Sequence, residues 1–269
     1  MSDVLLTGAT SGLGRWLAPR LGAAGLTVLL HGRDQEKVAR GVAEVEAVGG
    51  RAEGLVADLA SLADVGRLAA AVRDRPLTAL VNNAGVGFGP PDAAREVSAD
   101  GYELRWAVNL LAPVRLTEAL LPTLKANAPA RIVNVGSIGQ QPIDFDDLQL
   151  ERHYDGVNAY RRAKLALAAW TFDLAEELAG TGVTANCIHP ATFMDTGMVR
   201  EGVRVPLSTV EDGGPPTLRL VLFETRTGLF FDGERVGEPH PDAKDATVRA
   251  RLRAVLRQES ALRDASRPA

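Results

Sequence analysis

The chain has 269 residues, of which 46% are hydrophobic and 24% charged, and its formal net charge at pH 7 is −4. This composition is typical of a soluble protein, and the acidic balance argues against nucleic acid as a partner, because binding to phosphates needs clustered Lys and Arg. The one cysteine, Cys187, excludes an internal disulfide and a cysteine-based zinc site.

The start of the chain resembles neither a signal peptide nor a membrane anchor. No run approaches the roughly 18 apolar residues of a spanning helix, and Met1-Ser2-Asp3 lacks a basic n-region. Val4–Leu6 leads at once into a glycine-rich turn, so removal of a leader would remove a working element. We therefore expect an unprocessed cytoplasmic protein without a membrane partner.

From the start of the chain to His189, short β-branched or leucine-rich runs alternate with helical stretches. The expected strands are Asp3–Thr7, Thr27–His31, Ala52–Ala57, Ala79–Asn82, Arg131–Val135 and Thr184–His189. The expected helices are Gly12–Ala24, Gln35–Val48, Leu62–Asp74, Ala99–Ala126 and Val157–Ala179. Their apolar residues recur at three and four positions. This alternation predicts one α/β domain with a doubly wound parallel sheet and helices on both faces.

After His189, prolines and glycines interrupt this rhythm, at Pro190, Pro206, Gly213-Gly214-Pro215-Pro216 and Pro239. We expect loops and short helices over one edge of the sheet, a last strand at Gly228–Asp232 and an amphipathic helix over Ala243–Leu262. Residues 203–269 would form a substrate lid and the C-terminal segment. The arginines of the last helix are expected on a solvated face rather than in a basic patch; they are Arg249, Arg253 and Arg257.

The first expected strand ends in a glycine turn followed by a helix start, Thr7-Gly8-Ala9-Thr10-Ser11-Gly12-Leu13-Gly14. Gly8 permits a tight bend, Gly12 lets a pyrophosphate approach the backbone, and Gly14 lets the helix pack closely on the sheet. The helix N-terminus adds free N–H groups and positive potential. The turn is therefore a candidate dinucleotide site, with a purely structural turn as the alternative. Its candidate cofactor residues are Gly8, Thr10, Ser11, Gly12, Leu13 and Gly14.

The end of the second expected strand indicates which dinucleotide binds. A carboxylate there would hold the ribose 2′-hydroxyl of NAD, but the sequence reads His31-Gly32-Arg33-Asp34. The guanidinium of Arg33 suits a 2′-phosphate, which favours NADP(H) over NAD(H). Asp34 either takes the carboxylate role or caps the next helix. His31 is expected to be a packing residue at the strand end.

Later strand ends supply further candidates, because a cofactor bound in the crevice of such a sheet meets the carboxyl ends of the strands. These candidate cofactor residues are Asp58, Leu59, Asn83, Ala84 and Gly85.

Tyr160 and Lys164 lie four residues apart in an expected helix, so the phenol and the ammonium share one helix face. A phenol titrates near pH 10 when unperturbed, and a neighbouring ammonium favours its charged form. The spacing makes Tyr160 a candidate general acid and base. Ser137 follows the fifth strand, and Asn109 lies inside an expected helix.

Together these motifs resemble the short-chain dehydrogenase/reductase family. The matching pieces span residues 4–196 and are Thr7–Gly14, Asn82-Asn83-Ala84-Gly85, Asn109, Ser137, Tyr160 and Lys164. The 23-residue interval from Ser137 to Tyr160, with Phe145-Asp146-Asp147-Leu148-Gln149 inside it, resembles the retinol dehydrogenase-like, WW-domain oxidoreductase-like branch. The resemblance implies a single-domain Rossmann fold.

The resemblance also implies hydride exchange between the nicotinamide of NADP(H) and a carbonyl or alcohol carbon. Tyr160 would transfer the hydroxyl proton, and Ser137 would hydrogen-bond the substrate oxygen. Lys164 would bind the nicotinamide ribose and lower the pKa of the phenol, while Asn109 would hold a water of the proton relay. The loop after the sixth strand would add cofactor contacts from Pro190, Thr192 and Thr196.

The sequence departs from the family pattern at three places. Ala163 stands where a serine often precedes the lysine, and Pro190-Ala191 replaces Pro-Gly, with Thr196 one residue later than the common threonine. The third departure is Arg161-Arg162 beside the catalytic tyrosine. These arginines either favour an anionic substrate group or face solvent, and the solvent-facing reading is preferred.

Other polar residues carry no site in this interpretation. Asp144, Asp146 and Asp147 lack a convergent histidine and are expected in a solvated loop with Phe145 and Leu148 tucked inward, so no metal is predicted. Tyr154 has no lysine four residues on, and Cys187 is expected to be a small buried hydrophobe.

The residues expected around the substrate, in 86–91, 138–144 and 193–207, are mainly apolar, which predicts a mainly apolar carbonyl compound of medium size. Two alternatives stay open: a catalytically silent NADP-binding regulator on the same fold, and a non-redox member such as an epimerase or dehydratase.

The helix from Val157 is apolar nearly all round, so it is expected to be buried on more than one side. A homodimer or homotetramer, which the resemblance also implies, would cover it through a twofold contact. The alternative is that the segment after Pro206 folds back over it.

Overall fold

The structure is a computed structural model that describes residues 2–202 and 205–264, so residues 203–204 and 265–269 of the expected lid and C-terminal segment lie outside the described part. The strands are β1 (Asp3–Leu6), β2 (Thr27–Gly32), β3 (Arg51–Val56), β4 (Leu77–Asn82), β5 (Ala130–Val135), β6 (Val183–His189), β7 (Phe230–Asp232) and β8 (Arg235–Val236). The α-helices are α1 (Gly12–Ala23), α2 (Gln35–Glu46), α3 (Leu62–Val72), α4 (Leu104–Trp106), α5 (Ala112–Ala126), α6 (Gly156–Glu177), α7 (Gly197–Gly202), α8 (Val210–Phe223) and α9 (Ala246–Asp264). A π turn, η1 (Ala107–Leu111), and a 3-10 turn, η2 (Pro241–Ala243), complete the elements.

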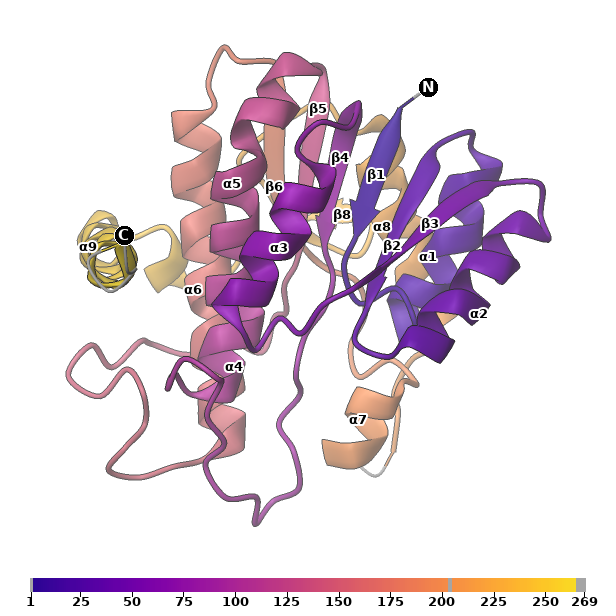
Figure 1. The fold of residues 1–269 in the computed structure, drawn as a ribbon. Helices are drawn as coiled ribbons and strands as arrows, with labels where there is room; N and C mark the ends of the chain where they lie inside the picture. Colours follow the sequence, from indigo (N-terminus) through magenta and orange to yellow (C-terminus); the bar gives the residue numbers. More distant parts are fainter. Residues whose placement is uncertain (1, 203–204, 265–269) are drawn as a thin grey trace.

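The strands form one sheet in the order β3-β2-β1-β4-β5-β6-β7-β8, parallel except for β8, which pairs antiparallel with β7. Helices α1, α2 and α8 cover one face, and α3, α5 and α6 cover the other (Figure 1). The expected doubly wound α/β fold is therefore confirmed. The order reverses at β1, whose neighbours are β2 and β4, and such a switch point is where ligands bind.

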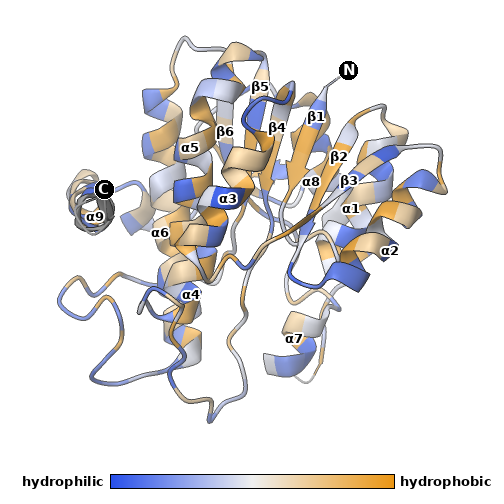
Figure 2. Cartoon of the chain, viewed as in Figure 1, coloured by the Kyte–Doolittle hydropathy of each residue, from blue (hydrophilic) through white to orange (hydrophobic). Residues whose placement is uncertain are grey.

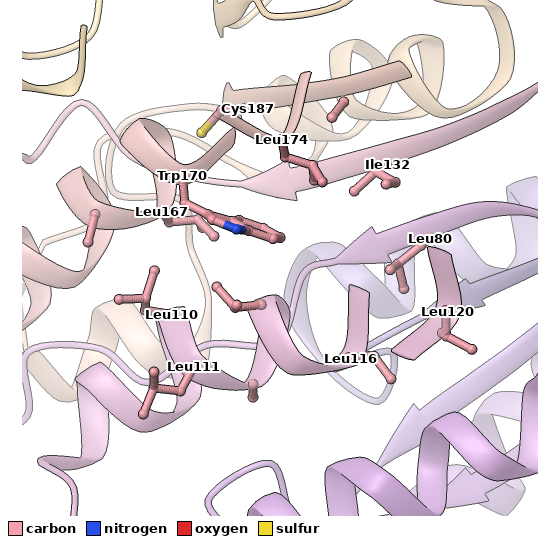
Figure 3. Packing of buried hydrophobic residues seen from close by; sticks show 14 of the residues in the cluster. Leu80, Leu110, Leu111, Leu116, Leu120, Ile132, Leu167, Trp170, Leu174 and Cys187 are labelled. Carbon is pink, nitrogen blue, oxygen red and sulfur yellow. The ribbon is translucent and has the colours of Figure 1, made fainter. Parts of the chain in front are cut away.

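The central strands are buried on both faces, and side-chain alternation divides the core in two. Leu5 belongs to the cluster beneath α3, α5 and α6, whereas Val4 and Leu6 belong to the cluster beneath α1 and α8. Apolar residues accordingly run through the sheet and line the inner sides of the helices in Figure 2. Figure 3 shows Trp170 of α6 between the sheet and the helix that carries Leu110.

One expected helix begins later than predicted. We expected it from Ala99, but Gly101 adopts a left-handed backbone (φ 84°) in a turn where Ser98 N–H donates to the carbonyl of Tyr102 over 2.7 Å. The helix begins at Leu104, with Glu103 as its N-cap. It then passes through the π turn η1, a feature frequent at functional sites.

The region expected to hold only loops and short helices contains the 14-residue helix α8. Thr209 and Asp212 form a capping box at its start. Gly214 leaves no room for a Cβ against the indole of Trp16, so α8 packs very closely on α1. This packing compensates for the backbone hydrogen bonds that Pro215 and Pro216 remove, which is why the proline signal misled the prediction.

The last helix, α9, lies beside α6 (Figure 1). Asp173 of α6 accepts hydrogen bonds of 2.6 Å from both Arg249 and Arg253 of α9, while Leu252 and Leu256 are buried between the helices. The solvated-face prediction is therefore wrong for Arg249, whose side chain is 13% exposed, whereas Arg253 keeps 42% of its side chain exposed. The C-terminal segment covers the outer side of α6, which was the alternative to a twofold contact.

Within the described residues, no helix combines the length and the hydropathy needed to cross a membrane.

Candidate active site

A cavity of about 530 Å³ lies at the carboxyl ends of the parallel strands, next to the switch point of the sheet. It brings together nearly all of the predicted cofactor and catalytic residues. Those lining it are Gly8, Thr10, Ser11, Gly12, Leu13, Arg33, Asp58, Leu59, Asn83, Ala84, Gly85, Ser137, Tyr160, Lys164, Pro190, Thr192 and Thr196. Gly14 and Asn109 do not line it, but they contact the lining residues Gly8 and Val86 respectively.

The glycine turn has the backbone that its sequence predicted. Gly8 and Gly12 have positive φ angles of 64° and 48°, which side chains rarely adopt, and a Cβ on Gly14 would overlap the carbonyl oxygen of Gly8. Asn83 holds the turn from β4, because its side-chain amide donates to the carbonyls of Thr7 (2.8 Å) and Gly8 (3.1 Å).

His31 is a second support of this turn that sequence reasoning treated only as packing. Its Nδ1 accepts from the Gly8 N–H (3.2 Å), and its Nε2 lies 3.1 Å from the carbonyl oxygen of Ala57. This pattern requires a neutral ring with the proton on Nε2. Burial lowers the pKa of His31, in keeping with that form. The sequence signal that could have revealed this role is a polar residue at the end of a buried strand.

The two residues after Gly32 take different roles. The Asp34 carboxylate accepts from the Lys37 N–H (2.9 Å) and caps α2, and this backbone hydrogen bond lowers its pKa. Arg33 lines the cavity, and within the described chain it has neither a hydrogen bond nor an ion pair. The guanidinium, not the carboxylate, is therefore available to a ribose-bound group.

Tyr160, Ser137 and Lys164 meet on one wall of the cavity. Lys164 is buried, its Nζ donates to the carbonyl of Val135 (2.7 Å), and it lies 5.7 Å from the centre of the Tyr160 ring. The hydroxyl of Ser137 accepts from the Gly139 N–H (2.9 Å) and lies near enough to the Tyr160 phenol to lower its pKa. The four-residue spacing on α6 thus places the phenol and the ammonium together, as predicted.

The electrostatics of this wall differ from the expectation in one respect. We expected the ammonium to lower the pKa of the phenol, but burial raises the pKa of Tyr160, opposed by the nearby hydroxyl of Ser137. Burial also lowers the pKa of Lys164 to about 8. Desolvation is the largest cause of the pKa shift of each group in the protein without cofactor.

Asn109 sits in the π turn and supports the loop after β4. Its amide donates to the carbonyl of Val86 (2.9 Å) and accepts from the N–H of the same residue (2.7 Å). Both ends of the side chain are therefore engaged. Its role in holding a relay water stays a prediction.

Aromatic rings and a short helix close the other side of the cavity. Phe88 packs edge-on against Tyr160 (ring centres 4.6 Å apart) and against Phe193 (6.2 Å). Phe193 adopts a left-handed backbone (φ 44°), uncommon for an aromatic residue. Beyond it, Thr196 lies over Gly12, and Met198 of α7 packs against Gly87. The loop after β6 thus covers the glycine turn.

The two arginines that follow Tyr160 have different surroundings. Arg162 has a side chain only 15% exposed, and it donates to the carbonyl of Asp147 (3.2 Å), so the solvent-facing expectation is wrong for it. Arg161 is exposed and lines the cavity.

The other polar and aromatic residues that the sequence singled out have structural roles away from the catalytic wall. The phenol oxygen of Tyr154 accepts from Arg105 (2.7 Å) and donates to Glu103 (3.3 Å), away from Lys164. Phe145 and Leu148 pack against the core, as expected, and Cys187 is fully buried. Across the described residues, no three His, Cys, Asp or Glu side chains gather as metal ligands would.

Comparison with known proteins places this geometry in a family. The sequence profile described as short chain dehydrogenase matches residues 2–204. Human retinol dehydrogenase 13 is 32% identical over 273 residues, covering 93% of this chain and 81% of the relative. Human retinol dehydrogenase 12 is 37% identical over 268 residues, covering 93% and 83%. Among solved structures, the RhlG/NADP active-site complex of Pseudomonas aeruginosa superposes with a TM-score of 0.70 at 28% identity, covering 86% of this chain and 94% of that one.

Proposed function

This chain belongs to the short-chain dehydrogenase family, in its retinol dehydrogenase-like branch, and on that premise we propose that it interconverts a carbonyl and an alcohol on a mainly apolar small molecule with NADP(H). The observation that carries the proposal is the single cavity that joins the glycine turn and Arg33 to Tyr160, Ser137 and Lys164. When bound, the nicotinamide supplies or accepts the hydride.

The residues of the chain position the substrate and move the proton. In the direction of reduction, the hydroxyls of Ser137 and Tyr160 both donate to the carbonyl oxygen, and Tyr160 then transfers its proton to that oxygen. Lys164 would hold the nicotinamide ribose, and its ammonium stabilises the phenolate that Tyr160 becomes after it has given up its proton. The apolar wall around Phe88 keeps water away from this oxygen.

Two observations support NADP(H) rather than NAD(H). Arg33 presents free donors to the cavity, and Asp34 is occupied as the cap of α2. A guanidinium fork suits a phosphate, and the RhlG structure is a complex with NADP. The fit of the cofactor is also supported by Gly8 and Gly12, which line the cavity with positive φ angles and without side chains.

A panel of ketones and aldehydes, followed by NADPH absorbance at 340 nm, tests the proposal. Consumption of one NADPH per alcohol formed supports a reductase. A silent cofactor-binding regulator would bind NADPH without turnover, and an epimerase or dehydratase would convert its substrate without net NADPH loss. The intact set of Ser137, Tyr160 and Lys164 on one wall favours an enzyme over the silent regulator, and the stoichiometry of NADPH consumption separates the reductase from the epimerase or dehydratase.

A cytoplasmic location is part of this proposal. Its support is that the buried thiol of Cys187 is the one cysteine of the chain, which fits a reducing compartment. Cell fractionation with an antibody to the chain tests it.

A further inference from the structure

Most of the charged groups that line the cavity have a partner or an assigned role. Lys164 is bound to the Val135 carbonyl, and His189 is bound to the Thr192 hydroxyl (3.1 Å). Arg33 and Asp58 line the end that also holds the glycine turn, with the Asp58 carboxylate accepting from the Ala60 N–H (3.0 Å). Asp58 is the one carboxylate among the described lining residues.

Arg161 is the exception. It lines the cavity directly after Tyr160 on α6, and within the described chain no hydrogen bond or ion pair engages it. Its neighbour Arg162 differs, because the guanidinium of Arg162 donates a hydrogen bond to the carbonyl of Asp147. The guanidinium of Arg161 keeps its donors free for a ligand.

The position of Arg161 indicates that this ligand is the substrate rather than the dinucleotide. Phosphates of a dinucleotide belong at the glycine turn and at Arg33, on strands β1 and β2. Arg161 instead follows Tyr160, at the end where the reacting oxygen lies. There the ring of Phe88 packs on the phenol, and Phe193 packs on Phe88. A positive group beside an aromatic wall suits a ring-bearing compound with a negative charge at its far end.

We propose that the substrate is an aromatic or otherwise planar carbonyl compound that carries a carboxylate, and that Arg161 binds this carboxylate. The inference rests on the proposed function, since it names the substrate class of the same site. Arg161 is then a specificity-determining residue: it binds the carboxylate while Tyr160 and Ser137 hold the carbonyl oxygen.

The test uses the full chain loaded with NADPH and two alcohols that cannot react with the reduced cofactor, 4-(hydroxymethyl)benzoate and benzyl alcohol. Isothermal calorimetry gives their dissociation constants. We expect the carboxylate to bind about fivefold more tightly, because an exposed ion pair contributes little. The preference should weaken as salt rises and fall to about one in Arg161→Gln.

Arg162→Gln is the matched control, since it removes the same charge from the next position and should keep the preference. Equal binding of the two alcohols to the wild type, binding of neither, or a preference that Arg161→Gln retains would overturn the inference. Reduction of benzaldehyde and 4-carboxybenzaldehyde is measured separately. Turnover of both with equal KM overturns this inference alone, whereas a carboxylate preference without any turnover contradicts the proposed function and leaves the anion site standing.

Discussion

The guanidinium of Arg105 donates a hydrogen bond of 2.7 Å to the phenol oxygen of Tyr154, linking α4 to the segment that precedes α6. Arg105 also donates to the carbonyls of Gly87 (2.9 Å) and Phe88 (3.3 Å). This buried side chain therefore holds the loop whose ring packs on Tyr160.

We expect Arg105→Met to lower the free energy of unfolding by about 3 kcal/mol, because it leaves the buried carboxylate of Glu103 without its ion-pair partner. Tyr154→Phe should cost less, about 2 kcal/mol, because it removes the hydrogen bonds of the phenol to Arg105 and Glu103 but leaves their ion pair in place. Urea denaturation measures both. Equal losses in the two variants would show that the ion pair with Glu103 is not the important contact.

Tyr160→Phe should reduce kcat by about a hundredfold to ten-thousandfold, because the ring keeps its packing on Phe88 and loses only the transferable proton. The affinity for NADPH, measured by fluorescence titration, should change little. Near-normal turnover in this variant would place the proton donor elsewhere.

Arg33→Ala should lower the ratio of kcat/KM for NADPH to that for NADH by about tenfold to a hundredfold, the loss of a charge-assisted hydrogen bond to the 2′-phosphate. Arg40→Ala, an exposed arginine of α2, is the control for general charge. An unchanged ratio in folded Arg33→Ala would refute the NADP(H) assignment.

Stability should fall as the pH drops below about 6.5. Burial depresses the pKa of His31 in the folded chain, so between that pKa and the ordinary value near 6.5 the unfolded chain binds more protons, and the free energy of unfolding decreases with acid. His31→Gln cannot titrate, so its urea midpoint should fall less between pH 7.5 and 5.5. The pKa of His189 is lowered in the same way, and this residue contributes equally to both proteins. Parallel curves would contradict the role of His31.

Light scattering should give a mass near 28.5 kDa for the full chain, because α9 covers the side of α6 that a twofold contact would use. The double variant Arg249→Gln, Arg253→Gln removes both hydrogen bonds to Asp173, and we expect it to form dimers at micromolar concentration. A wild-type mass of two or four chains would support the homodimer or homotetramer that the sequence analysis predicted.

Local patterns in the sequence were sufficient for much of the site. The glycines of Thr7–Gly14 need particular backbone angles, and the spacing of Tyr160 and Lys164 is a property of any α-helix. The alternation of Val4, Leu5 and Leu6 likewise follows from strand geometry. These features depend on residues close in the chain, so the sequence by itself predicted the sheet, the cavity wall and the candidate catalytic set.

Only the tertiary structure decided features that depend on distant partners. Trp16 on α1 explains why α8 is a helix despite its prolines, and Asp173 turns Arg249 and Arg253 from expected surface charges into contacts. The loop at Asp147 separates Arg162 from Arg161. Sequence periodicity shows which side of a helix is apolar or charged. Whether that side meets solvent, another helix or a ligand depends on packing against residues distant in the chain and on the cost of desolvating charged groups. Both are set only when the chain has folded.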